Sequence, residues 1–343
     1  MMEAVILTEF GGPDVLQRSR IERPSFRADQ MLVRVAACGV CGHDVLNRAG
    51  HFGETRLPAV LGHEISGTVD QVGALVARFK PSDRVVLLQR LPCGLCRSCQ
   101  SGRENLCRSG DGFYGEETLG GYGEYVVASE RNAVLLPPEI PFDVGAVLSC
   151  AVGTGFHALL RARVHPGDAV VITGASGGVG INTVQIARLM GLNIIAITSS
   201  DKKVSELRIA GADDVIVTGD FKFHDRVRTA TAGEGAAAVI EITGKPTFNS
   251  SIRALRPGGR LVLVGNVDPG PISLNPAISI LKEIELIGSG HAIISDLVQV
   301  VALVKRKNLL PLIAATMPIA EAAAAHRLLE GRSTIGRIVL THG

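Results

Sequence analysis

The chain has 343 residues, of which 46% are hydrophobic and 20% charged, and its formal net charge is +2. This length exceeds what one hydrophobic core usually spans, so two domains are expected. A nearly balanced charge without a run of basic residues favours neither a nucleic acid nor a membrane surface as a partner. No uninterrupted apolar stretch reaches the ~18 residues of a membrane span, and no signal peptide is evident, so we expect a cytoplasmic protein.

Residues 1 to about 150 are predicted to form a β-rich domain. Short apolar runs separated by Gly, Pro and Asp are typical of strands, and no long helical period accompanies them. These runs cover residues 31–37, 67–72, 84–88 and 124–127.

From residue 164 onward, apolar strands alternate with helices. Continuous apolar strands between helices predict a parallel sheet covered on both faces, here a six-stranded, doubly wound dinucleotide-binding domain with right-handed crossovers. A helical pattern over residues 178–190 follows the first of these strands. The strands are predicted at residues 169–173, 193–198, 214–217, 237–241, 260–264 and 284–287.

The C-terminal part is predicted to return to the first domain. It contains two helical patterns, at residues 296–307 and 319–330, and a final strand at residues 337–341. We therefore expect one domain from residues 1–150 and 291–343, and a second from residues 151–290.

Four cysteines crowd into one loop with the spacing C-x2-C-x2-C-x7-C. Four thiolates this close can surround one zinc ion tetrahedrally, which leaves no open position and makes the site structural. An iron–sulfur cluster or four unrelated thiols are the alternatives. Disulfides are not expected, because the chain shows no export signal. The predicted ligands are Cys93, Cys96, Cys99 and Cys107.

A second set of potential ligands is dispersed along the chain. The segment CGVCGHD contains Cys38 and Cys41, LGHEISG contains His63 and Glu64, and VLSCAVGTG contains Cys150. Each is a weak signal alone, since a lone His or Cys is more often a packed core residue. Together they supply three N/S ligands and leave a fourth position for water or substrate, as a catalytic zinc needs. Spacing alone does not choose between Cys38 and Cys41.

The segment GASGGVG follows a predicted strand and opens a predicted helix. This is the setting in which glycines let the backbone close on a pyrophosphate at a helix N-terminus, although the motif is not a strict GxGxxG. The residues expected to contact the cofactor here are Ser176, Gly177, Gly178, Val179 and Gly180.

The end of the next strand bears on the choice of cofactor. An NAD enzyme usually has Asp or Glu there to bind the ribose hydroxyls, whereas this chain has Thr198. Ser199, Ser200 and Lys203 follow, and hydroxyls with a lysine can hold a ribose phosphate. We therefore predict NADP(H). The alternative is a solvated polar turn in an NAD enzyme that tolerates the missing acid.

These motifs, followed by a final GRIVL, occur in the order typical of one family. The chain resembles the zinc-containing alcohol dehydrogenase type of medium-chain dehydrogenases/reductases from end to end. The resemblance implies an α/β protein with a β-rich GroES-like catalytic domain and a Rossmann domain, and two zinc ions per chain. It selects Cys41, His63 and Cys150 as the catalytic zinc ligands. Glu64 matches an acidic residue that can approach the metal, and Asp44 matches a carboxylate that orients the ligand histidine.

Further residues are expected near the cofactor. By resemblance, Thr154 lies near the nicotinamide ring and Arg337 near the pyrophosphate. Gly265 and Asn266 follow the fifth predicted strand, so we expect them near the nicotinamide end.

The chain departs from the family pattern at the proton relay. The family commonly has Ser or Thr where this chain has His43, and its relay histidine is replaced by Leu46. Imidazole can donate, accept and titrate near neutral pH, so His43 is predicted to carry the substrate proton. The alternative is a hydrogen-bonded packing residue.

The sequence thus predicts a zinc-dependent oxidoreductase that transfers hydride between NADP(H) and a small alcohol or carbonyl substrate. A second interpretation is NADPH-dependent reduction of an enoyl thioester, because the stretch from GASGGVG to ILKEIELIG resembles the acryloyl-CoA reductase branch. A third is a non-catalytic NADPH-binding protein, against which an open zinc site argues. The apolar edge strand at 284–287 predicts a homodimer or homotetramer.

Overall fold

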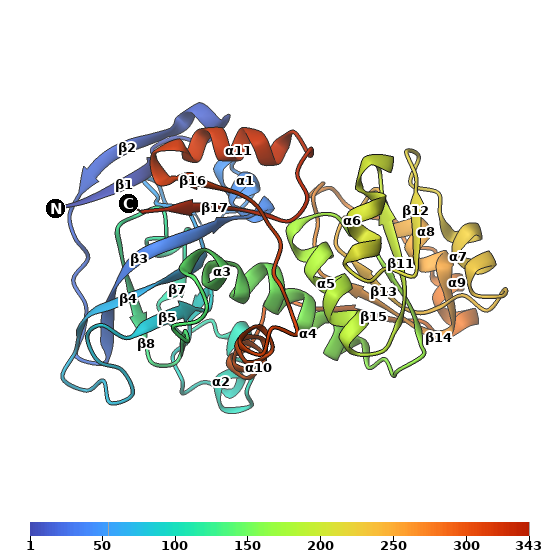
Figure 1. Cartoon of the computed structure of the whole chain (residues 1–343), viewed down its shortest axis with the longest axis horizontal. Helices are drawn as coiled ribbons and strands as arrows, with labels where there is room; N and C mark the ends of the chain where they lie inside the picture. Colours follow the sequence, from blue (N-terminus) through green and yellow to red (C-terminus); the bar gives the residue numbers. More distant parts are fainter. Residues whose placement is uncertain (54, 343) are drawn as a thin grey trace. The chain divides into compact units, whose positions relative to one another are not determined.

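The computed structural model describes residues 1–53 and 55–342. The chain divides into two compact units, the first made of Met1–Gly153 with His291–Gly343 and the second of Thr154–Gly290. The C-terminal segment, coloured red in Figure 1, belongs to unit 1 because its last strand pairs with a strand from the N-terminal part.

Unit 1 is built on a mixed sheet whose order is β16-β17-β3-β4-β5-β9, with β8 paired to β3. Its pairings are antiparallel except that of β16 with β17. The strands of this sheet are β3 (Gln30–Val40), β4 (Glu64–Val72), β5 (Arg84–Leu87), β8 (Tyr125–Ser129), β9 (Ala133–Leu135), β16 (Ile313–Pro318) and β17 (Arg337–Thr341). Two small antiparallel pairs complete it, β1 (Met2–Leu7) with β2 (Leu16–Ile21) and β6 (Arg90–Leu91) with β7 (Gly112–Phe113).

The strands predicted in this unit are present, and the structure adds β1, β2, β6, β7, β9 and β16 to them. The long strand β3 is almost wholly buried, as expected for a central strand of valines and small residues. Its register with β4 places Gly39 opposite Glu64. This pairing brings two sequence-distant motifs together at one end of the sheet.

The helices of unit 1 are short apart from α10. The longer ones are α1 (Gly42–Arg48), α3 (Phe142–Val147), α10 (Ile294–Lys305) and α11 (Ala322–Glu330). Single turns are η1 (Pro13–Val15), α2 (Arg97–Gln100), η2 (Glu104–Leu106), η3 (Leu148–Val152) and η5 (Ile319–Glu321).

A continuous helical stretch, Phe142–Ala162, was not predicted from the sequence. It runs from α3 through η3, a turn of π-helix, into α4 (Gly153–Ala162). Three glycines lower its helix propensity and obscure the helical period of its apolar residues. At least one of them is needed for packing, because a Cβ added to Gly145 would stand 2.6 Å from Leu136. The 21 residues are long and apolar enough to cross a membrane by length and composition, but 78% of the apolar window is buried, as in the core helix of a globular protein.

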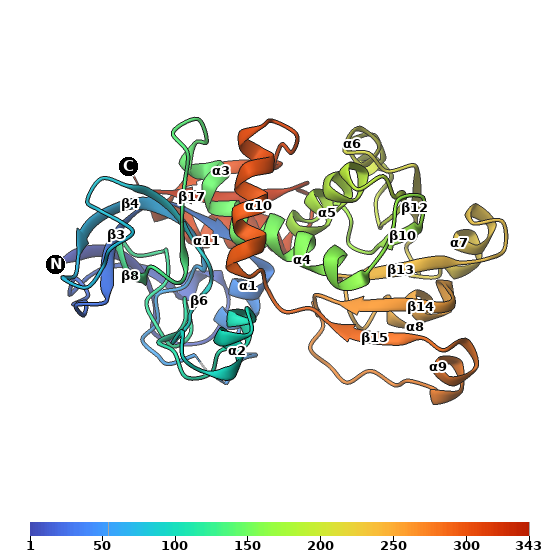
Figure 2. The ribbon, with the colours of Figure 1, turned by 90° about the horizontal axis from the view of Figure 1, so that it is seen from below.

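Unit 2 contains the predicted six-stranded parallel sheet, in the order β12-β11-β10-β13-β14-β15 (Figure 2). Its strands are β10 (Ala169–Ile172), β11 (Asn193–Thr198), β12 (Asp214–Val217), β13 (Ala236–Glu241), β14 (Leu255–Leu263) and β15 (Glu285–Gly288). Its other elements are α5 (Gly178–Leu189), η4 (Asp201–Lys203), α6 (Val204–Ile209), α7 (His224–Ala230), α8 (Phe248–Ala254) and α9 (Pro276–Lys282). From β10 the chain first adds strands β11 and β12 on one side and then β13, β14 and β15 on the other. Doubly wound sheets bind nucleotides at this point, where the strand order reverses.

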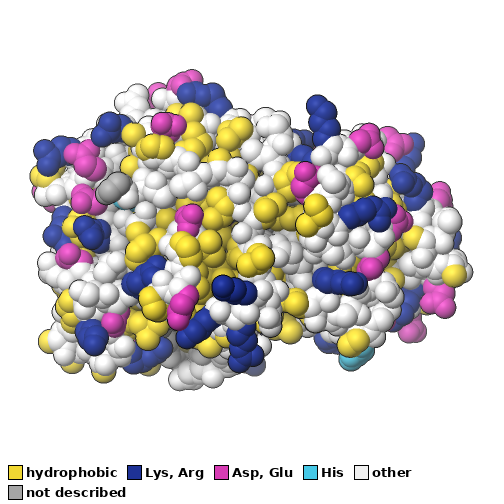
Figure 3. Space-filling view, in the orientation of Figure 1, with side chains coloured by type: hydrophobic (Ala, Val, Ile, Leu, Met, Phe, Trp, Pro, Cys, Tyr) yellow, Lys and Arg dark blue, Asp and Glu magenta, His cyan; other side chains and the backbone are white. Residues whose placement is uncertain are grey.

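Charged side chains of both signs are interleaved on the face of the protein seen in Figure 3. Lys and Arg lie beside Asp and Glu there rather than forming a field of one sign, as the small net charge of +2 leads one to expect.

Candidate functional site

The four clustered cysteines of unit 1 form a set of ligands for one metal ion. Four of the six Sγ–Sγ distances are 3.9 Å (Cys93–Cys99), 3.6 Å (Cys96–Cys99), 3.8 Å (Cys96–Cys107) and 3.6 Å (Cys93–Cys107). A regular tetrahedron of sulfurs around zinc, with bonds of about 2.3 Å, has edges of about 3.8 Å. The cysteine loop therefore fits a closed zinc site.

Backbone N–H groups turn toward these sulfurs. Cys93 Sγ accepts from the N–H groups of Leu95 (3.4 Å) and Cys96 (3.3 Å), and Cys107 Sγ accepts from the N–H of Cys93 (3.3 Å). The hydrogen bonds from Leu95 and Cys96 lower the pKa of Cys93 to about 6, whereas burial raises the pKa of Cys99 to about 12. The N–H groups directed at Cys93 favour its thiolate, the form that binds zinc.

The dispersed ligands also meet in unit 1. One ligand atom each from Cys41, His63, Glu64 and Cys150 lies within 4.8 Å of the others, and all four residues are buried. Cys41 is the N-cap of α1, and Cys150 lies in the π-helical turn η3. Glu64 is the first residue of β4, and His63 directly precedes it. Such turns often occur at functional sites. Cys38 is outside the cluster: it is buried within β3, and burial raises the pKa of its thiol.

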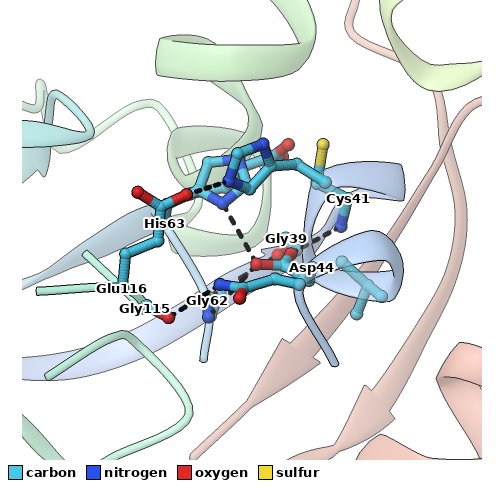
Figure 4. Close-up of polar contacts among 12 residues, drawn as sticks. Gly39, Cys41, Asp44, Gly62, His63, Gly115 and Glu116 are labelled. Atoms are coloured by element: carbon cyan, nitrogen blue, oxygen red, sulfur yellow. Dashed lines mark hydrogen bonds and ion pairs between the residues drawn. The ribbon is translucent and has the colours of Figure 1, made fainter. Parts of the chain in front are cut away.

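Asp44 orients the ligand histidine (Figure 4). Its Oδ1 lies 3.1 Å from Nδ1 of His63 and accepts from the N–H of Gly62 (3.3 Å), while its Oδ2 accepts from the N–H of Cys41 (2.9 Å). Burial alone would raise the pKa of Asp44, but the charge and hydrogen bond of His63 lower it. With Nδ1 engaged, His63 offers Nε2 to a metal.

Glu64 lies between the ligands and a buried arginine. Its Oε1 is 3.1 Å from Nη2 of Arg337, which is 4% exposed, and a Cβ added to Gly39 would stand 2.2 Å from its Oε2. Only glycine leaves room for this carboxylate. Burial, opposed by Arg337, raises the pKa of Glu64 to about 8. Both carboxylate oxygens lack an aligned hydrogen-bond donor among the described residues, so the carboxylate is available to a cation or a bound water.

His43 faces the same space and is paired with an acid. Its Nε2 lies 2.6 Å from Oε1 of Glu116, in side chains that are 26% and 10% exposed respectively. Its ring stacks on Phe52 with centroids 4.5 Å apart and meets the edge of His63 at 5.1 Å. Phe113 lies 5.4 Å from both imidazoles. Figure 4 shows Glu116 directed toward the histidines.

Two residues predicted to contact the cofactor, Thr154 and Arg337, lie near the predicted zinc ligands. Thr154 is buried in the first turn of α4, four residues after Cys150. Arg337 donates from Nη1 to the carbonyl of Val40 (3.3 Å), whereas its Nε and Nη2 have no aligned acceptor among the described residues. Their contacts with a cofactor remain predictions.

The glycine-rich turn of unit 2 joins β10 to α5. Gly174 has φ +56°, and Gly177 donates back to its carbonyl at 3.0 Å. An added Cβ at Gly180 would stand 2.3 Å from that carbonyl oxygen, so helix and turn approach as closely as glycine permits. The turn ends at the first N–H groups of a 12-residue helix, an arrangement suited to a phosphate.

The end of β11 has the polar character that the sequence indicated. Thr198 is 5% exposed, and its Oγ1 is buried without a hydrogen-bond partner in the described chain. Ser199 is exposed, Ser200 precedes the turn η4, and Lys203 is partly buried, which lowers the pKa of its amine. A buried hydroxyl without a partner fits a ligand that donates or accepts at this position.

Glu241 fixes the loops that carry the last predicted cofactor residues. It is completely buried at the end of β13, and five donors point to its carboxylate. They are the hydroxyls of Thr173, Thr247 and Ser251 and the N–H groups of Thr243 and Gly244. The loop held in this way touches the next one: a Cβ on Gly265 would stand 2.1 Å from the carbonyl of Ile242, and one on Gly244 2.7 Å from Asn266 Oδ1.

Comparison with known proteins decides the family. Residues 27–138 match the alcohol dehydrogenase GroES-like domain, and residues 178–306 match the zinc-binding dehydrogenase family. An acryloyl-coenzyme A reductase of Metallosphaera sedula is 32% identical over 343 residues, covering 99% of this chain and 100% of the relative. An NAD-dependent alcohol dehydrogenase of Saccharolobus solfataricus is 32% identical over 349 residues, covering 99% of each chain.

The chain belongs to the zinc-type alcohol dehydrogenases of the medium-chain dehydrogenase/reductase superfamily. Solved structures agree. The crystal structure of AibC superposes with a TM-score of 0.93 at 42% identity, covering 99% of this chain and 95% of that one. That of an NAD-dependent alcohol dehydrogenase superposes with a TM-score of 0.89 at 33% identity, covering 100% of both. The predicted GroES-like and Rossmann architecture is therefore confirmed, and the protein is an oxidoreductase.

One residue at this site, Glu116, and one contact, that of Glu64 with Arg337, were not found from the sequence. Glu116 was missed because no spacing rule links it to His43, 73 positions earlier. The ion pair of Glu64 with Arg337 was missed because it depends on the pairing of β17 with β3. Two adjacent acidic residues in a glycine-rich loop were the only local signal for Glu116.

Proposed function

We propose that this protein is a zinc-dependent, NADP(H)-preferring oxidoreductase that interconverts an alcohol and a carbonyl compound. The observation that carries the proposal is the buried cluster of Cys41, His63 and Cys150, with the histidine held by Asp44 and Glu64 alongside. Zinc bound by these residues would polarise a substrate oxygen and lower the pKa of an alcohol, and NADP(H) would exchange the hydride.

His43 and Glu116 are proposed to move the substrate proton. Because a carboxylate only accepts hydrogen bonds, the Nε2–H of His43 donates to Glu116, which leaves Nδ1 as the basic nitrogen. Nδ1 then takes the proton from an alcohol or returns it to a reduced carbonyl, while the carboxylate stabilises the charged ring. Phe52, stacked on the imidazole, helps to fix its orientation.

The residues proposed to bind NADP(H) in unit 2 lie at or directly after the carboxyl ends of β10 and β11. The turn from Gly174 to Gly180 and the start of α5 suit the pyrophosphate. Thr198 with Ser199, Ser200 and Lys203 suits a 2′-phosphate, which the carboxylate usual in NAD enzymes would repel.

Reduction of an enoyl thioester is a second candidate function. Two relatives are named acryloyl-coenzyme A reductase, and each matches 99% of this chain. The absence of the hydroxyl-then-histidine relay at positions 43 and 46 also weakens the case for plain alcohol chemistry. In this case the polarised oxygen would be that of the thioester carbonyl, NADPH would give its hydride to the β-carbon, and a proton would go to the α-carbon beside the carbonyl group.

A homodimer is proposed to form at the free edge of the unit 2 sheet. Strand β15 has β14 as its neighbour on one side, and Leu286 on it is 41% exposed. Leu281 on the preceding helix α9 is 83% exposed. A second copy that pairs along this edge would cover both.

Oxidation of NADPH by the purified enzyme tests these functions directly. An aliphatic aldehyde and an enoyl thioester would be compared as substrates, each before and after removal of zinc by a chelator. We expect turnover of at least one of them that is lost on chelation and restored by zinc. Turnover that persists without zinc would contradict the proposal, and turnover confined to the thioester would establish the second candidate.

A further inference from the structure

A small hollow in unit 1 lies one aromatic side chain away from the predicted zinc ligands. It has a volume of about 10 Å³, which is room for a single oxygen atom such as that of one water molecule. It is lined by Leu88, Gln89, Arg90, Glu104, Asn105, His291 and Ala292.

The hollow contains a buried donor without an acceptor. Gln89 lies between β5 and β6 and is 1% exposed, and its Nε2 has no hydrogen-bond partner among the described residues. An unsatisfied buried amide is costly, so a natural protein seldom keeps one without a ligand or water to fill the place. The backbone around Gln89 is firmly placed, because its carbonyl accepts from the N–H of Tyr114 at 3.0 Å.

A second donor, Arg90, is adjacent. Its side chain is 15% exposed and lies 3.7 Å from a carboxylate oxygen of Glu117, too far for a hydrogen bond, and its guanidinium carbon is 5.5 Å from the ring of Phe113. Most N–H groups of this guanidinium are therefore unengaged by charged groups in the described chain.

The charges around the hollow favour a neutral acceptor. Glu117 balances the charge of Arg90, and Glu104 adds a carboxylate whose Oε1 accepts from the N–H of Ile294 (2.5 Å). Burial, with His43 and Arg90 nearby, lowers the pKa of His291 to about 3, so this ring adds no positive charge. Two carboxylates, Glu104 and Glu117, would repel an anion, and only one guanidinium would attract it. An uncharged carbonyl oxygen is not repelled in this way and can accept hydrogen bonds from Gln89 and Arg90.

The ring of Phe113 lies between the hollow and the predicted zinc ligands, tilted by 45° to the ring on each side. Phe113 lies 5.0 Å from His291, which lines the hollow, and 5.4 Å from the predicted ligand His63. His291 has φ +56°, a strained conformation for a residue with a side chain, and such strain concentrates at functional sites.

We propose that Gln89 and Arg90 form a binding subsite for a second, uncharged carbonyl oxygen of the substrate, some bonds away from the carbonyl that reacts. This inference rests on the proposed function, since it places the reacting oxygen at the zinc ligands. The substrate class is then a dicarbonyl compound, either an oxo-aldehyde or a thioester whose thiol part carries an amide.

The test compares substrates with and without a second carbonyl oxygen; the heptanal pair differs in that oxygen alone, and the thioester pair differs in the whole thiol part. Heptanal is set against oxoheptanals with the ketone at successive carbons, and crotonyl butyl thioester against crotonyl pantetheine, in the wild type, in Gln89→Leu and in Gln17→Leu, an exposed glutamine on β2 as the control. We expect the wild type and the control to prefer at least one dicarbonyl member by about tenfold in kcat/KM. In Gln89→Leu that ratio should fall to near one. An unchanged ratio in Gln89→Leu would overturn the proposal.

A thermal unfolding measurement, which does not depend on turnover, separates failure of the proposed function from failure of the proposed subsite. If neither heptanal nor the thioesters react in the wild type, the proposed function fails, and the subsite is judged by stability alone. Replacement of an unsatisfied buried amide by an apolar side chain of similar size should leave the thermal midpoint unchanged or raise it. A midpoint lowered by several degrees would show that Gln89 has a structural partner and would overturn the subsite independently of activity.

Discussion

The replacement of Gly39 by alanine tests how tightly the carboxylate of Glu64 is built into the predicted zinc centre. The added Cβ would stand 2.2 Å from Oε2, 2.9 Å from Cδ and 3.0 Å from Cβ of Glu64. The two residues are direct partners in the β3–β4 ladder, so the backbones cannot separate without breaking strand pairing. The carboxylate must therefore retreat by about 1 Å, which disturbs its 3.1 Å contact with Arg337.

The cost follows from these contacts. Overpacking of a buried site typically costs about 1–3 kcal/mol, and weakening a buried ion pair adds to it. We expect Gly39→Ala to lose about 2–4 kcal/mol of stability, or several degrees in thermal midpoint, and to lose more than tenfold in kcat. Thermal unfolding and NADPH oxidation would be measured on the zinc-loaded protein.

Two further variants make the result specific. Gly12→Ala is the control, because an added Cβ there meets no atom within 4 Å. In the Gly39→Ala background, Glu64→Asp shortens the acid and should recover part of the lost stability. A Gly39→Ala protein with the midpoint and turnover of the wild type would refute this account of the glycine.

Three other predictions follow from the described contacts. Thr198→Asp should weaken NADPH binding by about ten- to a hundredfold and improve NADH binding, and Lys203→Ala should weaken NADPH alone; unchanged kcat/KM ratios for the two cofactors would show that this turn selects nothing. Light scattering at micromolar concentration should give at least a dimeric mass, and a monomeric mass would exclude pairing along β15. His326 is fully buried between Arg48 and Tyr122, and burial lowers its pKa to about 4. Because the unfolded chain takes up this proton near pH 6.5 and the folded protein only near pH 4, stability should decline as the pH falls through this window, by up to about 3 kcal/mol; a His326→Asn variant with an equally steep decline would contradict the assignment.

The parts of the fold that the sequence predicted are those governed by local pattern. Five of the six parallel strands of unit 2 lie within one residue of their predicted positions, because they are short, mainly apolar runs. The sixth, β14, begins at Leu255 and not at residue 260 as predicted, because its first half contains Arg, Pro and Gly and shows no apolar run. The helix over Phe142–Ala162 was missed because its glycines, needed for close packing, weaken the local signal. Strands such as β9 and β16 are too short or too irregular to stand out.

The same distinction holds for the site. The cysteine loop could be predicted because its ligand spacing is local, whereas Cys41, His63 and Cys150 were selected by the family resemblance, since spacing alone left Cys38 as an alternative. The pairing of His43 with Glu116 could not, since it joins a helix start to a loop through tertiary folding alone. Likewise Gln89 carries no motif, and its importance emerges only from burial without a partner.

The zinc content of the purified protein tests the central claim most directly. The account predicts two zinc ions per chain in the wild type, one in Cys150→Ser with turnover abolished and the fold retained, and a destabilised protein with at most one zinc in Cys96→Ser. A wild type that reproducibly holds a single zinc ion, and a Cys150→Ser variant with the same zinc content and turnover as the wild type, would contradict it.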